Sequence, residues 1–250
     1  MAQPKVSIIT IVYNGSATLT KTIESIASQT YTNIEYIIVD GHSTDGTQEI
    51  IKQHHKSISN WISESDNGLY DAMNKGIKMA TGDYLWFINS GDEIYDPTTL
   101  QQLFDQDQAP YADVYYGDTV MIDKQSNVIG DRRLQPPAKL SWKDFKNGML
   151  VSHQSILVST KVAELYNLTY RFSADFEWCL KALKKSRKTV NTHLTLSRFL
   201  DGGLTKQNIM PGLKERFHIM TKHFGFFPTL LKHIPIGFRF LGYVIKNKRF

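Results

Sequence analysis

A strand-helix-strand pattern at the start of the chain most strongly limits its fold. Residues 5–12 (KVSIITIV) and 34–39 (IEYIIV) are short, β-branched, apolar runs that each end in polar residues. Uninterrupted runs of this kind are typical of parallel strands that are buried on both faces of a sheet. Between them, apolar residues recur at helical spacing from Leu19 to Ala27, with Ser16 as the expected helix cap. The pattern therefore predicts an α/β fold built on parallel strands.

The same alternation continues through the first half of the chain. Helical spacing over residues 70–80 ends at Gly82, and the apolar run 84–88 (YLWFI) predicts another buried strand. Asp96 and Pro97 then predict the N-cap and first turn of a further helix. We expect these elements to form a nucleotide-binding half of the domain, over about residues 1–108.

After residue 110 the pattern changes. Residues 113–123 and 127–134 predict two strands around a turn, residues 153–159 predict another strand, and a helix is expected to begin near Asp175. The chain shows no internal repeat and no low-complexity linker. We therefore expect a single α/β domain over residues 1–205, whose second half, about 109–205, forms the acceptor side.

The last 45 residues differ in charge from the rest. Residues 206–250 hold nine Lys or Arg and one acid, a net charge of +8, so the first 205 residues carry −3 of the total of +5. Apolar residues form two helical stripes there, at Leu213, Phe217, Met220 and Phe224 and at Phe238, Leu241 and Ile245. No run approaches the 18 or more apolar residues of a spanning helix. Two interpretations stay open: a basic amphipathic segment on an anionic membrane surface, or a terminal helix packed on the core.

Composition limits the class and the compartment. An apolar fraction of 41% with 21% charged residues is ordinary for a globular protein and argues against disorder. Cys179 is the single cysteine, so no internal disulfide can form, which favours a reducing compartment. The beginning of the chain lacks the pattern of a signal peptide. We therefore expect a cytoplasmic protein.

Polar residues follow the first two predicted strands. Thr10, Tyr13 and Asn14 lie at the end of the first strand, and Asp40 ends the second. Ligands of open α/β sheets bind at the carboxyl ends of the strands, so these side chains are candidates for a nucleotide site. A polar strand end without any ligand explains the first group equally well. Residues 45–47 are interpreted as a structural turn that starts a helix.

The segment 63–76 (SESDNGLYDAMNKG) joins a polar turn to a polar helix start. Asp66 lies in the turn, and Lys75 lies on a helix whose opposite face is apolar. Lys75 can reach a phosphate or pair with Asp71, one turn earlier. An exposed helix face accounts for Lys75, but it does not account for the whole polar segment.

These motifs, taken in order, resemble the N-terminal domain of the family 2 glycosyltransferases. The matching segments are VSIITIVYN, VDGHSTDGT, ESDNGLYDAMNKG and FINSGDE. The later segments HQSILV, SADFEWCLKAL and FLDGGLT resemble the branch that builds bacterial O-antigen, colanic acid and capsule repeat units. The resemblance covers about residues 4–205. It implies the GT-A fold, a Rossmann-like mixed sheet flanked by helices, here followed by a basic amphipathic C-terminal helical tail over residues 206–250.

The resemblance also implies roles for individual residues. Asp175, in SADFEW, stands at the position of the catalytic base, although a helix-capping role is the alternative. Asp92 is the expected ligand of Mn²⁺ or Mg²⁺. The remaining candidates are expected to bind the nucleotide sugar: Thr10, Tyr13, Asn14, Asp40, Asp66, Lys75, Asn89, Ser90, Gly91 and His153. For His153, a structural role is the alternative. UDP is the expected nucleotide, because it is the commoner partner in the family.

The turn FINSGDE holds Asn89 where the family usually carries an acid, which leaves Asp92 as the expected metal ligand. Hard cations such as Mg²⁺ commonly use one or two protein carboxylates and complete their shell with substrate phosphates and water. Asn89 can add its amide oxygen or bind the ribose. We therefore expect a site that binds the metal weakly until the donor arrives.

Three functions are compared. The resemblance favours an inverting, metal-dependent hexosyltransferase that transfers a sugar to a lipid-linked (undecaprenyl-pyrophosphate type) saccharide in the biosynthesis of bacterial surface polysaccharides (O-antigen, lipopolysaccharide, capsule or exopolysaccharide). The basic tail agrees with peripheral association with the inner face of the cell membrane. The alternative is a non-catalytic nucleotide-sugar-binding or scaffold subunit of the same pathway. Binding of nucleic acid by the tail is disfavoured, because its charges alternate with large apolar residues.

Overall fold

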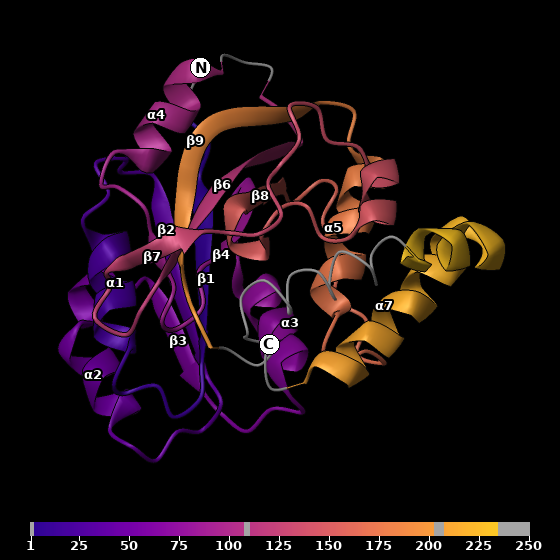
Figure 1. The fold of residues 1–250 in the computed structure, drawn as a ribbon. Coiled ribbons are helices and arrows are strands. Elements are labelled where there is room, and N and C mark those ends of the chain that lie inside the picture. Colours follow the sequence, from indigo (N-terminus) through magenta and orange to yellow (C-terminus); the bar gives the residue numbers. More distant parts are fainter. Residues whose placement is uncertain (1–2, 108–110, 203–207, 235–250) are drawn as a thin grey trace.

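The computed structural model describes residues 3–107, 111–202 and 208–234 (Figure 1). Within these residues the centre is one nine-stranded mixed sheet in the order β3-β2-β1-β4-β8-β6-β9-β5, with β7 paired to β6. The strands are β1 (Val6–Val12), β2 (Ile34–Asp40), β3 (Asn60–Ser63), β4 (Tyr84–Phe87), β5 (Glu93–Ile94), β6 (Val114–Ile122), β7 (Val128–Asp131), β8 (Ile156–Ser159) and β9 (Thr189–Leu200). The predicted fold class, a mixed sheet flanked by helices, is confirmed.

The sheet has a parallel half and a mixed half. β1 lies between β2 and β4 and is parallel to both, and β3 extends the parallel half beyond β2. β8 is antiparallel to β4 and to β6, whereas β9 is parallel to β6 and antiparallel to β5. The parallel half corresponds to the apolar runs that the sequence shows as buried strands.

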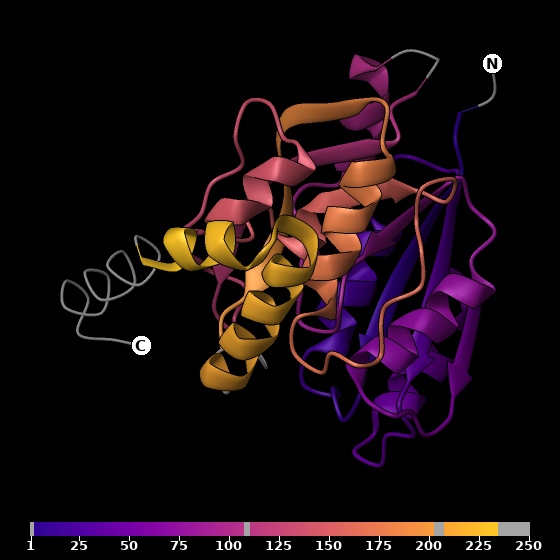
Figure 2. The same ribbon diagram turned by 90° about the vertical axis from the view of Figure 1, so that its right-hand side faces the viewer.

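Helices cover both faces of the sheet (Figures 1 and 2). Helices α1, α2 and α4 lie on one face, and α3, α5 and α7 lie on the other. The α-helices are α1 (Leu19–Ala27), α2 (Thr47–Gln53), α3 (Leu69–Met79), α4 (Thr99–Gln106), α5 (Ala174–Lys185) and α7 (Ile209–Phe224). Short 3₁₀ helices are η1 (His55–Ser57), η2 (Trp142–Asn147) and η3 (His153–Ser155).

The alternation of side chains along β1 explains this layered core. Ile9 and Ile11 pack in the apolar cluster under α3 and α5, whereas Ile8 and Val12 pack in the cluster under α1 and α4. All four side chains are buried. Successive side chains of a strand point to opposite faces, so a continuous apolar run fills a core on each side of the sheet.

Two predicted helix starts are wrong. α1 begins at Leu19 after Thr18, and the backbone N–H of Ser16 donates instead to Asp45 Oδ2 (3.0 Å). α4 begins at Thr99, because the Asp96 carboxylate accepts hydrogen bonds from the backbone N–H (2.9 Å) and hydroxyl (2.5 Å) of Thr98. Asp96 therefore closes a turn in front of the helix rather than capping it.

The second half of the chain contains a strand that the sequence pattern did not reveal. β9 is 12 residues long and pairs with β6 and β5. Its side chains alternate between apolar and polar, and Thr, Ser and Asn occupy many positions, so the run lacks the continuous apolar character of β1. The predicted strand 153–159 is confirmed only from Ile156, because residues 153–155 form η3.

α7 packs on the core. For residues 209–224, this agrees with the interpretation of the tail as a terminal helix packed on the core. Ile219 and Met220 are buried in the cluster that contains α3 and α5. The Phe224 ring stacks on Trp142, with ring centroids 5.4 Å apart and an interplanar angle of 5°. Leu213 is exposed, and the predicted stripe of Phe238, Leu241 and Ile245 lies outside the described residues. In the described part of the chain, no helix has the length and apolar character required to span a bilayer.

Candidate functional site

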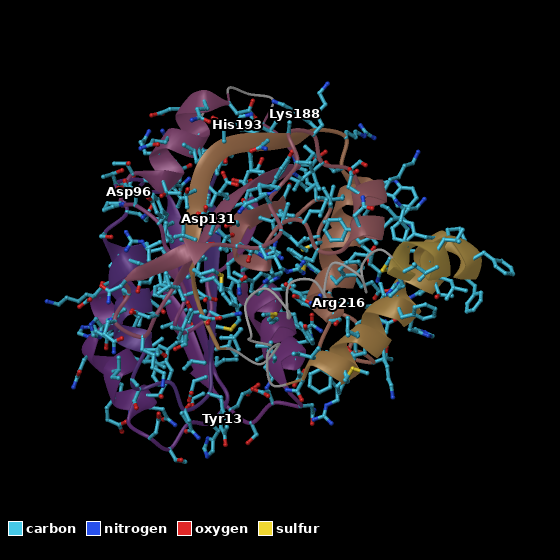
Figure 3. All side chains as sticks on the ribbon, in the orientation of Figure 1. Tyr13, Asp96, Asp131, Lys188, His193 and Arg216 are labelled. Carbon is cyan, nitrogen blue, oxygen red and sulfur yellow. The ribbon has the colours of Figure 1, made fainter. Side chains whose placement is uncertain are left out.

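The carboxyl ends of the parallel strands β1, β2 and β3 bring Tyr13 and Asp66 together. Tyr13 follows β1 and is 69% exposed, at the lower end of the molecule in Figure 3. Gly41 follows β2, and a Cβ atom there would lie 2.8 Å from Asp66 Oδ2 and 3.3 Å from Tyr13 Cδ2. Gly41 therefore leaves room for the ring and the carboxylate side by side. An exposed aromatic ring can stack on a planar base, and a carboxylate can accept its hydrogen bonds.

Asn14 and Asp40 hold the loop after β2 in place. Asn14 has a φ of 49°, its backbone N–H donates to Ser43 Oγ (2.7 Å), and its Oδ1 accepts from the Thr44 N–H (3.0 Å). Asp40 is buried, and its carboxylate accepts hydrogen bonds from the hydroxyl of Ser43 and from Ser63 Oγ (2.6 Å). Both residues position the loop beside Tyr13, and a direct contact with a nucleotide stays a prediction for them.

Thr10 and Lys75 also make contacts within the protein. The hydroxyl of Thr10 is buried, donates to the Ile88 carbonyl (2.6 Å) and accepts from the Tyr36 hydroxyl (3.1 Å). Lys75 Nζ donates to the Ser65 carbonyl (2.8 Å) and forms an ion pair with Glu64 (2.9 Å). Lys75 thus fastens the turn that carries Asp66 to α3, and a contact of either residue with a nucleotide is untested.

The turn after β4 presents an unpaired oxygen. Asn89 Oδ1 is buried and has no hydrogen-bond partner among the described residues. Ser90 Oγ lies 3.0 Å from Thr18 Oγ1, which joins the turn to the start of α1. Gly91 has a φ of 98°, and a Cβ atom there would lie 2.7 Å from Leu200 Cδ2. Only glycine adopts this conformation without strain, so the turn can pass close to β9.

Asp92 is a buried carboxylate at the end of this turn. Its Oδ1 accepts a hydrogen bond from the Leu200 N–H (3.0 Å), and its Oδ2 accepts one from Gln154 Nε2 (3.0 Å). Burial raises the pKa of Asp92 to about 7, against the effect of these two hydrogen bonds. Gln154 was not singled out from the sequence, because its contact with Asp92 depends on the packing of η3 against the turn.

The oxygen atoms at this turn fit a hard divalent cation. The described residues contain no group of three or more His, Cys, Asp and Glu side chains that could hold a metal ion. Asp92 and the unpaired Oδ1 of Asn89 are nevertheless oxygen donors of the kind that Mg²⁺ and Mn²⁺ prefer. A cation held by so few protein ligands needs further oxygens from a substrate phosphate and from water.

Asp175 lies at the first turn of α5 and faces α3. Its Oδ1 accepts hydrogen bonds from the Tyr70 hydroxyl (3.1 Å) and from the backbone N–H of Phe176 (2.8 Å). Burial and the charge of Asp175 raise the pKa of Tyr70 well above its usual value, so Tyr70 stays a hydrogen-bond donor. The sequence indicated Tyr70 only as an apolar position of a helix, and its contact arises from the packing of α3 against α5.

His153 lies in the aromatic core between the two carboxylates. Its ring is buried 5.1 Å from Phe87 and 5.6 Å from Trp178, measured between ring centroids, and its Nε2 lies 2.6 Å from the Tyr166 hydroxyl. Burial lowers the pKa of His153 to about 4, although the charge of Asp175 opposes this shift, so the ring is neutral at pH 7. These are the contacts of a packed residue, which was the alternative role for His153.

The structure thus brings some of the predicted site residues close to one another. Gln154 contacts Asp92, and the adjacent His153 packs on Trp178, which lies one helical turn after Asp175. Tyr13 follows β1 and Asp66 follows β3, and both lie next to Gly41 at the end of β2, the strand between them.

Known structures share this architecture. The model is similar to Staphylococcus aureus TarS 1-349 in complex with UDP-GlcNAc, with a TM-score of 0.65, 16% identity, and coverage of 87% of this chain and 66% of that chain. It is also similar to the mannosyltransferase PcManGT from Pyrobaculum calidifontis in complex with GDP-Man and Mn²⁺, with a TM-score of 0.64, 14% identity, and coverage of 89% and 65%. These matches show that the chain has a GT-A-like fold.

The sequence comparisons identify the family. The model of glycosyl transferase family 2 matches residues 7–166, and the chain belongs to this family. It is 34% identical over 187 residues to an uncharacterised glycosyltransferase of Mycobacterium tuberculosis (strain H37Rv), covering 72% of this chain and 69% of the relative. It is 30% identical over 236 residues to a PGL/p-HBAD biosynthesis glycosyltransferase of Mycobacterium bovis (strain BCG), covering 89% and 87%. The predicted family is confirmed, whereas these names do not indicate the O-antigen, colanic acid and capsule branch in particular.

Proposed function

We propose that this chain is an inverting, metal-dependent hexosyltransferase that moves a sugar from a nucleotide sugar to a hydroxyl group of a lipid-linked saccharide. The observation that carries the proposal is the half-buried carboxylate of Asp175, which accepts a hydrogen bond from the Tyr70 hydroxyl of α3 (3.1 Å). A carboxylate in hydrogen-bond reach of the attacking hydroxyl removes its proton as a general base, which typically contributes about 10²- to 10⁴-fold in rate.

The donor nucleotide is proposed to lie at the ends of β1 and β2. The exposed ring of Tyr13 would stack on the base, and Asp66 would accept a hydrogen bond from the base or the ribose. UDP is the proposed nucleotide, and the UDP-GlcNAc complex of TarS supports this choice by similarity of fold. The GDP-Man complex of the archaeal mannosyltransferase makes GDP the competing candidate.

Asp92 and Asn89 would hold Mn²⁺ or Mg²⁺. When bound, such a cation neutralises the charge that develops on the leaving diphosphate. The unpaired Asn89 Oδ1 supports this assignment, because an acceptor buried without a partner costs free energy unless a ligand satisfies it. Calorimetric titration of Mn²⁺ should show weak binding to the protein alone and stronger binding with UDP; equal affinity in both titrations would contradict the proposed site.

An exposed apolar stripe is proposed to rest on the membrane that holds the acceptor. Residues 226–234 are helical, and their exposed large apolar side chains recur on one helical face: Phe226, Phe227, Leu230, Leu231 and Ile234. The stripe follows α7 in the segment that carries a net charge of +8, which complements anionic lipid. This arrangement favours peripheral association with the cytoplasmic face of the cell membrane.

Sedimentation with phosphatidylglycerol vesicles tests the membrane contact. F227E introduces a charge at a side chain that is 75% exposed, and V128E introduces the same charge at an exposed residue of β7, away from the stripe. The bound fraction should fall for F227E and stay near that of the unmodified protein for V128E. Equal binding of both variants would exclude the stripe as the contact.

A role in bacterial surface polysaccharide biosynthesis is the proposed setting. The mycobacterial relatives named for PGL/p-HBAD biosynthesis support a glycosyltransferase that acts in cell-surface biosynthesis, and the O-antigen or capsule assignment rests on the sequence motifs. The alternative, a non-catalytic nucleotide-sugar-binding subunit, makes a different prediction for Asp175.

Transfer assays with the purified protein separate these two functions. UDP-, GDP- and dTDP-sugars are incubated with undecaprenyl-diphosphate-linked saccharides, with and without Mn²⁺. D175N should lower the transfer rate by about 10²- to 10⁴-fold while nucleotide binding is retained. D105N is the control, because Asp105 is exposed on α4 and contacts Gln101. Full activity of D175N would refute the role of Asp175 as the base. If neither the unmodified protein nor a variant transfers sugar although nucleotide is bound, the non-catalytic subunit is favoured.

A further inference from the structure

Arg132 is a partly buried cation that forms no ion pair with a carboxylate of the described residues. It follows β7, and its guanidinium donates hydrogen bonds to the carbonyl oxygens of Leu134 (2.9 Å), Met149 (2.7 Å) and Leu150 (3.1 Å). Burial and the charge of Arg216 lower the pKa of Arg132 to about 10, against the charge of Asp175. Arg132 therefore stays protonated at neutral pH, held in one place by backbone carbonyls and close enough to Arg216 and Asp175 to interact with their charges.

α7 brings a second arginine to the same place. Glu215 accepts hydrogen bonds from the backbone N–H groups of Arg171 (2.8 Å) and Phe172 (2.8 Å), and the Gly212 carbonyl accepts one from Ser173 Oγ (3.1 Å). These contacts dock α7 on the residues that directly precede Asp175. Arg216 follows Glu215 and lies between α7 and the ends of α3 and α5 in Figure 3.

Arg216 is partly buried, and one nitrogen of its guanidinium is unpaired among the described residues. Its Nε is buried and has no hydrogen-bond partner among the described residues. In this part of the chain, neither Arg132 nor Arg216 forms an ion pair with a carboxylate. Two neighbouring cations repel each other, and a buried N–H without an acceptor is unfavourable. A bound anion with several oxygen atoms would remove both costs.

We propose that Arg132 and Arg216 bind a phosphate or diphosphate group of a substrate next to Asp175. The proposal rests on the proposed glycosyl transfer, in which both the nucleotide sugar and the lipid-linked acceptor carry a diphosphate. Planar guanidinium groups bind phosphate oxygens through two parallel, charge-assisted hydrogen bonds. They would also offset the repulsion between Asp175 and a phosphate, so that both could occupy the same site.

The position of the pair also links the site to α7. Arg216 lies on the helix that leads into the exposed stripe at residues 226–234, whereas Tyr13 follows β1 and Asp66 follows β3. If the bound diphosphate belongs to the lipid, Arg216 contacts the acceptor substrate. If it belongs to the donor, Arg216 contacts the diphosphate at the end of the nucleotide that is distant from the base. The two sources differ in their consequences for UDP binding.

Titration of the full chain with inorganic pyrophosphate and with UDP, in metal-free buffer, tests the proposal. R216Q and R132Q should each weaken pyrophosphate binding by about ten-fold or more, the loss expected for a charge-assisted hydrogen bond. R216K keeps the charge but not the planar fork, so its loss should be smaller. R171Q is the control, because Arg171 is exposed and contacts Glu215 through its backbone N–H.

The outcomes distinguish the source of the phosphate. Parallel weakening of UDP binding in R216Q would assign the site to the donor, and unchanged UDP binding would assign it to the acceptor. Pyrophosphate binding that is the same in R216Q, R132Q and R171Q, or that is absent in the unmodified protein, would overturn the proposal. Thermal unfolding without ligand identifies a variant that fails to fold. Because these titrations require no sugar transfer, their failure is distinct from failure of the proposed function.

Discussion

Glu177 provides a quantitative test of how α7 is held beside the site. It lies on α5, two residues after Asp175, with a side chain that is 1% exposed. Its Oε1 accepts hydrogen bonds from Lys222 Nζ (2.9 Å) and His223 Nε2 (3.1 Å) of α7. Burial lowers the pKa of His223, and Lys184 Nζ lies 3.0 Å from its Nδ1. A neutral ring that donates from Nε2 and accepts at Nδ1 satisfies all three groups.

We predict that E177Q lowers the free energy of unfolding by about 2 kcal/mol. A hydrogen bond to a charged group contributes about 1.5–3 kcal/mol. The contribution of Lys222 is reduced, because its side chain is 50% exposed and can regain water when the charge of residue 177 is removed. A loss of about 2 kcal/mol corresponds to a decrease in Tm of about 4–8 °C for a chain of this size. Urea and thermal unfolding followed by circular dichroism measure both quantities.

The effect should depend on pH. Burial alone would raise the pKa of Glu177, but hydrogen bonds from Lys222 and His223 outweigh it and hold the pKa below its usual value. A carboxyl pKa that is lower in the folded state stabilises the fold above the unfolded pKa, near 4.5, and this stability is lost as the pH falls through the folded pKa. The difference between E177Q and the unmodified protein should therefore be largest at neutral pH and shrink below about pH 4.5.

E164Q is the matched control for this charge removal. Glu164 is 36% exposed and forms ion pairs with two lysines of α5. Exposed ion pairs of this kind contribute little to the free energy of unfolding. The free energy of unfolding of E164Q should differ from that of the unmodified protein by no more than about 0.5 kcal/mol. If E177Q is as stable as E164Q at pH 7, the ion-pair contacts of Glu177 do not hold α7 in place, and the reasoning is refuted.

Three further predictions concern the site. Y13A should weaken the free energy of UDP binding by about 1–3 kcal/mol, which is the value for stacking of a base on an aromatic ring, and should leave the Tm unchanged. Unchanged affinity in a fluorescence titration would show that Tyr13 does not contact the nucleotide. G91A should lower the free energy of unfolding by at least about 1–2 kcal/mol, because alanine is strained at this positive φ and its Cβ meets Leu200. An unchanged midpoint of urea unfolding would contradict the turn geometry. The imidazole proton signals of His153 should not titrate between pH 5.5 and 8, because burial lowers its pKa to about 4; an NMR titration midpoint near 6.5 would show that the ring is solvated.

Local pattern was sufficient to predict the parallel half of the fold. The apolar runs of β1, β2 and β4 can be buried only between two layers of helices, and their polar ends meet at one edge of the sheet. Asp92 and Asp175 were placed by motif, and their burial and hydrogen bonds agree with a site at this edge. The sequence pattern did not predict β9, because a strand with mixed polarity has no distinct local pattern.

Several roles within the site depend on contacts that no local pattern contains. Tyr70 and Gln154 contact the two carboxylates across 105 and 62 residues of sequence. His153 is a motif residue, but packing of Phe87 and Trp178 around it makes it a core ring. Spacing along a helix or strand indicates which face a residue occupies, but not which distant side chain packs against that face.

The sequence by itself therefore determined the layers, the family and the segments that supply the site. Strand and helix periodicities are local, and each apolar face must be buried, so these properties follow from neighbouring residues. The tertiary structure alone decided that the Nε of Arg216 on α7 is buried without a hydrogen-bond partner among the described residues, and that Asn89 keeps an unpaired oxygen in the turn that ends at Asp92. Charge and hydrogen bonding act through space, so the state of each polar group is set by the partners that the fold brings to it or leaves out.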